Sequence, residues 1–130
     1  MKVLIVDDIP DAVELVRMTL LQAGIISEQG DFRGAHSVSS ARLEILRERP
    51  DLVILDEILP GESSRDLLHE PGLAGVPVIL ISAAVVASPG GSNEQIPGMG
   101  PRLLGRLAKW GWRDLDRMGG VLRRLILENP

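Results

Sequence analysis

The stretch that most constrains the fold of this chain is an unbroken apolar run that ends in a carboxylate. It reads Leu52-Val53-Ile54-Leu55, leads into Asp56, and lies between Pro50-Asp51 and Pro60-Gly61. A short, continuously apolar run between turn residues is typical of a strand buried on both faces of a parallel sheet. Open α/β sheets bind ligands at the carboxyl edge of such strands. Asp56 is therefore a candidate functional residue, although a single Asp here is also an ordinary start to a loop.

A second run of the same kind stands at the N-terminus. Lys2-Val3-Leu4-Ile5-Val6 is followed directly by Asp7 and Asp8. Two buried strands would then bring three carboxylates to one edge of a sheet, where their negative charges repel each other and favour a bound cation. Ligand sets made only of oxygen are typical of hard cations, and Mg²⁺ accepts one or two carboxylates together with water and phosphate oxygens. The pattern therefore predicts a magnesium site.

Helical and strand patterns alternate along most of the chain. Further strands are expected at residues 32–36, 76–82 and 103–108, and helices at 11–23, 39–48, 63–70 and 113–128. This alternation indicates parallel βαβ units, and therefore an α/β fold with a doubly wound parallel sheet and helices on both faces.

Capping residues and apolar spacing give finer expectations for these helices. Asp11 is expected to cap the first helix, with Glu14 at the reciprocal position and Gly24 as the stop. The second helix is expected to bury Ala41 and Ile45, together with Leu43 or Leu46. The Pro- and Gly-rich stretch 87–101 argues against a regular helix there. Gly119-Gly120 inside the last helix should cost about 1 kcal/mol each relative to Ala.

Length and composition exclude several classes of protein. At 130 residues and 45% apolar content, one domain with a real core is expected. Cysteine is absent, and His36 and His69 are too few and too far apart in sequence to form a metal motif. The net charge of −4 and the scarcity of aromatic residues argue against nucleic-acid binding. No apolar run has the length of a membrane span, so a cytoplasmic protein without membrane contact is expected.

Lysine is rare in this chain, and one lysine follows the last expected strand. Lys109 would reach the same sheet edge as the carboxylates, where a flexible positive charge suits a phosphoryl group. Taken together, Asp7-Asp8, Asp56 with Pro60 four residues later, Ser82-Ala83 and Lys109 resemble the receiver domain of two-component response regulators, the CheY-like superfamily. The resemblance covers nearly the whole chain, and it implies the flavodoxin-like strand order 2-1-3-4-5 over one domain, residues 1–130.

The resemblance also implies a role for each matching residue. Asp56 would be the phosphoacceptor, and Asp7, Asp8, Asp56 and the backbone carbonyl of Ile58 would bind Mg²⁺. Ser82, Ala83 and Lys109 would bind the phosphoryl group, with Ser82 as the switch hydroxyl. The implied partners are a sensor histidine kinase or phosphotransfer protein and a downstream effector, with a homodimer through the face near the last strand and helix as a further option. The chain would be a signalling phosphoacceptor rather than an enzyme.

Three departures from the family pattern fall in the region that such domains use for output. Trp110 follows the lysine where proline is usual, Arg106 stands where an aromatic switch residue is common, and the segment for the fourth helix is rich in Pro and Gly. We therefore expect Arg106 and Trp110 on an output surface, an irregular fourth helix, and a readout through residues 84–101.

Two other functions are alternatives to this one. A pseudo-receiver that serves as a phosphorylation-independent interaction module would keep the fold without the chemistry, although the complete acidic set argues against it. A metal-dependent phosphatase with an Asp nucleophile needs a second Asp two residues after the first, and Ile58 occupies that position.

Overall fold

A computed structural model describes residues 1–27, 31–59, 62–82, 102–108 and 115–127 of the chain. Among these residues, five strands form one sheet in the order β2-β1-β3-β6-β7. Each neighbouring pair is parallel. The strands are β1 (Val3–Val6), β2 (Phe32–Ala35), β3 (Leu52–Asp56), β6 (Pro77–Ser82) and β7 (Arg102–Ala108).

The strand order confirms the predicted order 2-1-3-4-5, since β6 and β7 are the fourth and fifth strands of this sheet. The two intervening labels belong to a small antiparallel pair, β4 (Ile58–Leu59) and β5 (Glu62–Ser63), which follows β3 directly. Every residue of β1 and β3 is buried. This complete burial is why their sequences are continuously apolar instead of alternating.

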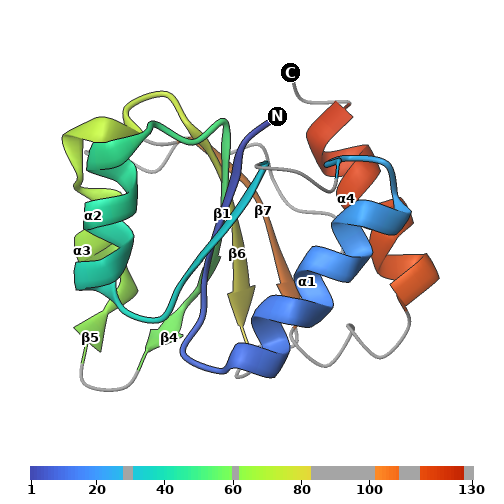
Figure 1. Ribbon diagram of the computed structural model, residues 1–130, viewed down its shortest axis with the longest axis horizontal. Coiled ribbons are helices and arrows are strands. Elements are labelled where there is room, and N and C mark those ends of the chain that lie inside the picture. The colour runs from blue at the N-terminus through green and yellow to red at the C-terminus, as the bar shows by residue number, and fades with distance from the viewer. Residues whose placement is uncertain (28–30, 60–61, 83–101, 109–114, 128–130) are drawn as a thin grey trace.

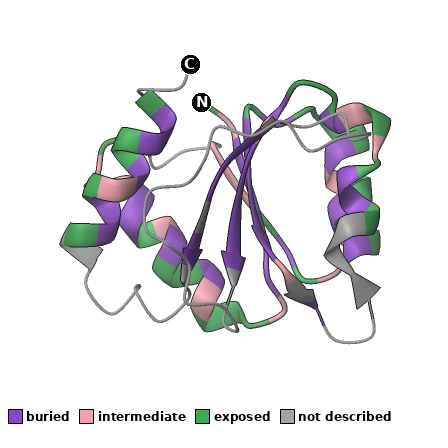
Figure 2. Cartoon of the chain, turned by 180° about the vertical axis from the view of Figure 1, so that it is seen from behind, coloured by how far each residue is buried: buried purple, intermediate pink, exposed green. Residues whose placement is uncertain are grey.

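Helices cover both faces of the sheet, as Figure 1 shows. On one face lie α1 (Pro10–Gln22) and α4 (Leu115–Leu127), which pack with Val3, Ile5 and Ile54. On the other lie α2 (Val38–Arg47), α3 (Ser64–Leu68) and the 3-10 turn η1 (Pro71–Leu73), on a core that includes Leu4, Val53 and Leu55. Alternate residues of β1, β3 and β6 therefore belong to the two cores. In Figure 2 the buried positions line the inner side of both helical layers.

The start of α1 differs from the prediction. Its N-cap is Ile9, which makes no side-chain capping bond, and Pro10 is the first helical residue. Asp11 lies inside the first turn instead of capping it, and Glu14 pairs with Arg17. Proline suits this position because the first helical N–H has no partner within the helix. The predicted stop is confirmed, since Gly24 follows the helix with φ +74°, a conformation that favours glycine.

The second helix begins earlier than predicted and buries fewer leucines. The Ser37 side chain caps it by accepting a hydrogen bond from the backbone N–H of Ser40. In turn, the Ser40 side chain accepts a hydrogen bond from the backbone N–H of Ser37. Ala41 and Ile45 are buried as expected, whereas Leu43 and Leu46 are 63% and 74% exposed. The expectation that one of these leucines is buried was therefore wrong, because Val38 completes the buried stripe of this helix.

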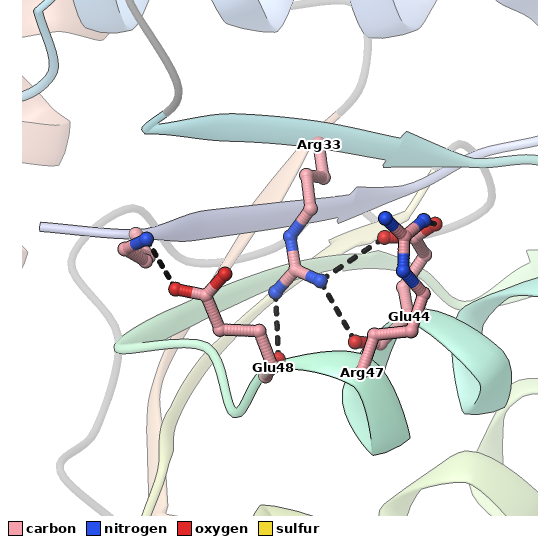
Figure 3. A network of polar contacts seen from close by, with 5 residues as sticks. Arg33, Glu44, Arg47 and Glu48 are labelled. Carbon is pink, nitrogen blue, oxygen red and sulfur yellow. Dashed lines mark hydrogen bonds and ion pairs between the residues drawn. The ribbon is translucent and has the colours of Figure 1, made fainter.

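An arginine from the edge strand holds the other end of α2 (Figure 3). Arg33 donates from Nη1 to the backbone carbonyl and the carboxylate of Glu44 at 2.8 and 3.0 Å, and from Nη2 to the carbonyl of Glu48 at 2.7 Å. The carboxylate of Glu48 in turn pairs with Lys2, and Arg47 lies 3.3 Å from Glu44. Arg33 thereby places a positive charge on a carbonyl of the last turn and on the C-cap carbonyl of α2, which suits the helix dipole.

The remaining helices end close to their predicted positions. The third helix stops at Leu68, before the expected end at residue 70, and Pro71 opens η1 instead of only ending α3. Gly72 in that turn lets α2 approach closely, because a Cβ there would lie 2.6 Å from Cγ2 of Ile45. In α4, Gly119 faces α1, with the Cβ of Ala23 3.5 Å from where its own Cβ would be, whereas Gly120 is exposed with nothing within 4 Å.

Two expectations lie outside the described residues, namely the irregular fourth helix at 84–101 and the turn at Lys109-Trp110. None of the helices in the described part of the chain is long and apolar enough to span a membrane.

Candidate metal and phosphoryl site

Three carboxylates meet at the carboxyl edge of the two central strands. Asp7 and Asp8 follow β1, and Asp56 is the last residue of β3. These strands are neighbours in parallel register, with Val6 opposite Leu55. One carboxylate oxygen from each of the three residues lies within 4.8 Å of the others. The sequence prediction that these three side chains converge is therefore confirmed.

Burial makes this cluster unlike an ordinary acidic surface. Asp7 and Asp56 are each only 3% exposed, and Asp8 is half-buried at the rim. Buried charges interact more strongly than charges in water, so three ionised groups at this separation favour a cation between them. The donors are all hard oxygens, as Mg²⁺ requires. The residues present therefore fit a magnesium ion, with Asp8 the most exposed of the three.

Backbone hydrogen bonds fix the loops that carry these carboxylates. The amide of Asp7 donates to the carbonyl of Ala35 at 3.0 Å, which extends the pairing of β1 with β2 by one residue. The amide of Ile9 donates to Oδ1 of Asp7 at 3.0 Å and so orients that carboxylate. The amide of Glu57 donates to the carbonyl of Ile81 at 2.9 Å and anchors the backbone after Asp56 to β6.

One histidine that was not predicted as a site residue, His36, lies beside the cluster. Nδ1 of His36 is 3.2 Å from the backbone carbonyl of Asp7, close enough for a hydrogen bond in the tautomer that carries the proton on Nδ1. His36 follows β2, which is the neighbour of β1. Only its position at the end of an expected strand could have indicated this placement, because the spacing of the two histidines forms no metal motif.

The structure places the other predicted site residues only in part. Ser82 ends β6 at the same sheet edge, one residue beyond the Asp56–Ile81 pair. Ile58 opens β4 two residues after Asp56, and Arg106 lies in β7 opposite Leu80. Ala83, Lys109 and Trp110 are outside the described residues, so their predicted roles stay predictions.

Comparison with solved structures identifies the fold. The receiver domain of the Francisella response regulator 1452 matches 99% of this chain and 98% of its own, with a TM-score of 0.66 and 20% identity. A receiver domain of a putative Luxo repressor protein from Vibrio parahaemolyticus matches 98% of this chain and 94% of its own, with a TM-score of 0.62 and 25% identity. The chain has the CheY-like receiver fold. The resemblance seen in the sequence is thereby confirmed for the fold.

A third similar structure is a receiver that was solved with a bound metal ion. The response regulator TrrA of Thermotoga maritima, solved in complex with Mg²⁺ and BeF, matches 97% of this chain and all of its own, with a TM-score of 0.64 and 23% identity. The similar structures include a chemotaxis protein, CheY4 of Vibrio cholerae, and response regulators, all of which are signalling proteins.

One curated protein is similar in sequence. The probable transcriptional regulatory protein TcrX of Mycobacterium tuberculosis is 42% identical over 87 residues, which are 62% of this chain and 33% of that protein. The match thus spans a third of the relative's length. No family model matches the chain.

Proposed function

We propose that the chain is a phosphoacceptor receiver domain, residues 1–130, in a two-component phosphorelay. Asp56 takes a phosphoryl group from a sensor histidine kinase or a phosphotransfer protein, and the change alters a surface that a downstream effector recognises. The observation that carries this proposal is the convergence of Asp7, Asp8 and Asp56 at one edge of a receiver fold. The domain is then a signalling phosphoacceptor that assists only its own phosphorylation and dephosphorylation.

The proposed reaction is a phosphoryl transfer between two side chains. A carboxylate oxygen of Asp56 attacks the phosphorus of a phosphohistidine, a new P–O bond forms, and the P–N bond breaks. The electron pair of that bond leaves with the imidazole of the donor, which takes up a proton, and Asp56 becomes an acyl phosphate. Catalysis of such a step rests on positioning and on the neutralisation of charge.

The chain's own residues would supply the positioning. Asp56 is held at the end of a fully buried strand, close to the half-buried Asp8. Asp7, Asp8, Asp56 and the backbone carbonyl of Ile58 would hold Mg²⁺. Bound there, the ion would neutralise the charge of the carboxylates and of the incoming phosphoryl oxygens.

The remaining roles in the proposal concern phosphoryl binding and output. Ser82 would donate its hydroxyl hydrogen to one phosphoryl oxygen, the small Ala83 would bind beside it, and Lys109 would pair with another phosphoryl oxygen. Arg106 and Trp110 would lie on the output surface. Readout through residues 84–101 stays a prediction, which hydrogen exchange with and without a beryllofluoride phosphate mimic would test.

The alternative is a pseudo-receiver that binds partners without being phosphorylated. Arg106 in place of an aromatic residue and Trp110 in place of proline favour it, because both change the output region. The intact acidic cluster favours phosphorylation, because it keeps together the carboxylates that would hold Mg²⁺ and accept the phosphoryl group.

Intact-protein mass measurement after incubation with acetyl phosphate and Mg²⁺ separates these functions. A receiver gains one phosphoryl group, Asp56→Asn gains none, and Asp66→Asn, an exposed control on α3, is labelled like the unchanged chain. Equal labelling of Asp56→Asn would contradict the assignment of the acceptor. A folded unchanged chain that takes no label from acetyl phosphate or from phosphohistidine donors would support the pseudo-receiver.

A further inference from the structure

The turn that joins β2 to α2 contacts the loop that carries two of the three carboxylates. The amide of Asp7 donates to the carbonyl of Ala35 at 3.0 Å, and Nδ1 of His36 lies 3.2 Å from the carbonyl of Asp7. Both main-chain polar groups of Asp7 are therefore bound at the end of β2. Because a carbonyl oxygen only accepts hydrogen bonds, the second contact requires the imidazole proton on Nδ1.

The His36 ring lies where the parallel ladder would place a main-chain donor. β1 pairs with β2 as far as Ala35, so the next pair in register is Asp7 with His36. Continuation of a parallel ladder would make the amide of Ser37 donate to the Asp7 carbonyl. That amide donates to Oγ of Ser40 at 3.1 Å, as part of the capping box that starts α2. The imidazole therefore replaces a donor that the cap of α2 uses.

The same cap fixes the backbone from which the His36 ring reaches out. The amide of His36 donates to Oγ of Ser40 at 3.2 Å. The Ser37 side chain accepts from the amide of Ser40 at 3.1 Å, so residues 36 and 37 are tied to the first turn of α2. Although His36 is an exposed residue, its ring therefore contacts Asp7 from an anchored position.

The group that this contact orients is the peptide between Asp7 and Asp8. A peptide unit is planar, so a fixed carbonyl of Asp7 also fixes the amide of Asp8 and the direction in which the chain enters that residue. The chain bends at Asp8, which is half-buried, whereas Asp7 and Asp56 are each 3% exposed. With less packing around it, the Asp8 carboxylate depends more on its backbone for its direction.

We propose that His36 is a positioning residue for the magnesium site. Its Nδ1–H holds the Asp7–Asp8 peptide, and thereby keeps the Asp8 carboxylate with those of Asp7 and Asp56. This inference rests on the proposed function, because it requires Mg²⁺ at these three carboxylates. His36 acts through the backbone and not as a ligand, since the ligand atoms that converge within 4.8 Å in the described part of the chain belong to the three aspartates.

Mg²⁺ titration of the full chain, by calorimetry, tests the proposal with a matched pair of variants. His36→Asn keeps a donor, because Nδ2 of Asn is as far along the side chain as Nδ1 of the imidazole, whereas His36→Leu has the same reach without a donor. The control is His69→Leu, which changes an exposed histidine after α3. Thermal unfolding without Mg²⁺ should show all three variants folded, because both histidines are exposed.

The affinity for Mg²⁺ should fall about tenfold in His36→Leu, as is typical when a group that orients metal ligands is lost. His36→Asn should restore most of that affinity, and His69→Leu should leave it unchanged. Equal affinities in His36→Leu and the unchanged chain would overturn the proposal. An Asn variant as weak as the Leu variant would do the same, because the donor would then not be what matters.

The nitrogen signals of the imidazole in NMR give a test that needs no variant. In mildly alkaline solution, where an imidazole is neutral, the His36 ring should carry its proton on Nδ1 and leave Nε2 unprotonated. A neutral ring with the proton on Nε2 has no donor for the Asp7 carbonyl. That result would contradict the proposal whatever the variants show.

Labelling by acetyl phosphate over a series of Mg²⁺ concentrations separates this inference from the proposed function. His36→Leu should need about tenfold more Mg²⁺ for its half-maximal rate, and should approach the rate of the unchanged chain at saturating Mg²⁺. Labelling of His36→Leu with an unaltered Mg²⁺ dependence would refute the role of His36 and leave the phosphoacceptor in place. A chain that binds Mg²⁺ but takes no label would contradict the phosphoacceptor, while the titration would still decide the role of His36. Absence of Mg²⁺ binding would overturn both.

Discussion

The amide of Ile9 donates a hydrogen bond to Oδ1 of Asp7 at 3.0 Å, across the turn that joins β1 to α1. Ile9 is also the residue from which α1 starts, so one short turn sets both the start of a helix and the direction of a buried carboxylate. The geometry of the acidic cluster is therefore tied to the entry of α1.

This link predicts that removing the Ile9 N–H weakens metal binding. Ile9→Pro deletes the donor and leaves all three carboxylates in place. Groups that orient metal ligands typically change affinity by about 10–100-fold when they are lost, and a tenfold weaker Mg²⁺ affinity is expected. Isothermal titration or Trp fluorescence with Mg²⁺ measures this, with Ile9→Val as the control that keeps the donor. Equal Mg²⁺ affinity in Ile9→Pro and Ile9→Val would show that the bond does not orient the ligand.

Replacing Gly120 or Gly72 with alanine should change the stability of the fold in opposite directions. Gly120→Ala should raise the free energy of unfolding by about 1 kcal/mol, because the position is helical, exposed and without contacts within 4 Å. Gly72→Ala should lower it by about 1–3 kcal/mol, because the new Cβ would lie 2.6 Å from the stiff side chain of Ile45. Urea unfolding measures both. If Gly72→Ala had the same free energy of unfolding as the unchanged chain, η1 would have to shift easily away from α2.

Replacing Arg33 with lysine should lower the free energy of unfolding although the positive charge is kept. Arg33→Lys keeps the charge but cannot reach the carbonyls of both Glu44 and Glu48, which the guanidinium bonds with separate nitrogens. A loss of about 1–3 kcal/mol in the free energy of unfolding is expected. Arg47→Lys, on α2 itself, is the matched control. Its effect on the free energy of unfolding should be near zero, because the Arg47 side chain is 76% exposed.

The Lys2–Glu48 pair predicts a pH-dependent contribution to stability. A hydrogen bond from Lys2 lowers the pKa of Glu48 in the folded chain. The ionised carboxylate therefore stabilises the fold at pH values above its unfolded pKa, and this contribution is lost as the pH falls through the lowered folded pKa. Unfolding of Lys2→Met should differ most from the unchanged chain near neutral pH and least in acid. A difference that stays constant across that range would rule out Glu48 as its source.

The sheet and the acidic cluster could be predicted from sequence because strands buried on both faces of a parallel sheet require a continuously apolar pattern. The run before Asp56 is apolar at every position, and the structure places a strand with the same bounds there. Once two such strands are recognised, the parallel arrangement brings Asp7, Asp8 and Asp56 to one edge without further information.

What the sequence could not predict depends on contacts between elements. Asp11 has the chemistry of a helix cap, but the helix begins one residue earlier because Pro10 suits the first helical position. Leu43 and Leu46 have the hydrophobicity of core residues, but the buried side of α2 is formed by other side chains, Val38, Ala41 and Ile45. His36 reaches Asp7 because β2 lies beside β1, a neighbour relation that no local spacing encodes.

Both ends of α2 are fastened to the rest of the domain, by the Ser37–Ser40 capping box at one end and by Arg33 at the other. Contacts at both ends oppose fraying of the helix, so its backbone is held in place relative to the sheet. Ordering a binding surface usually takes conformational entropy from the association free energy. For α2 most of that ordering is already achieved when the chain folds, so even a small exposed apolar area on this helix can contribute to recognition with little entropic loss.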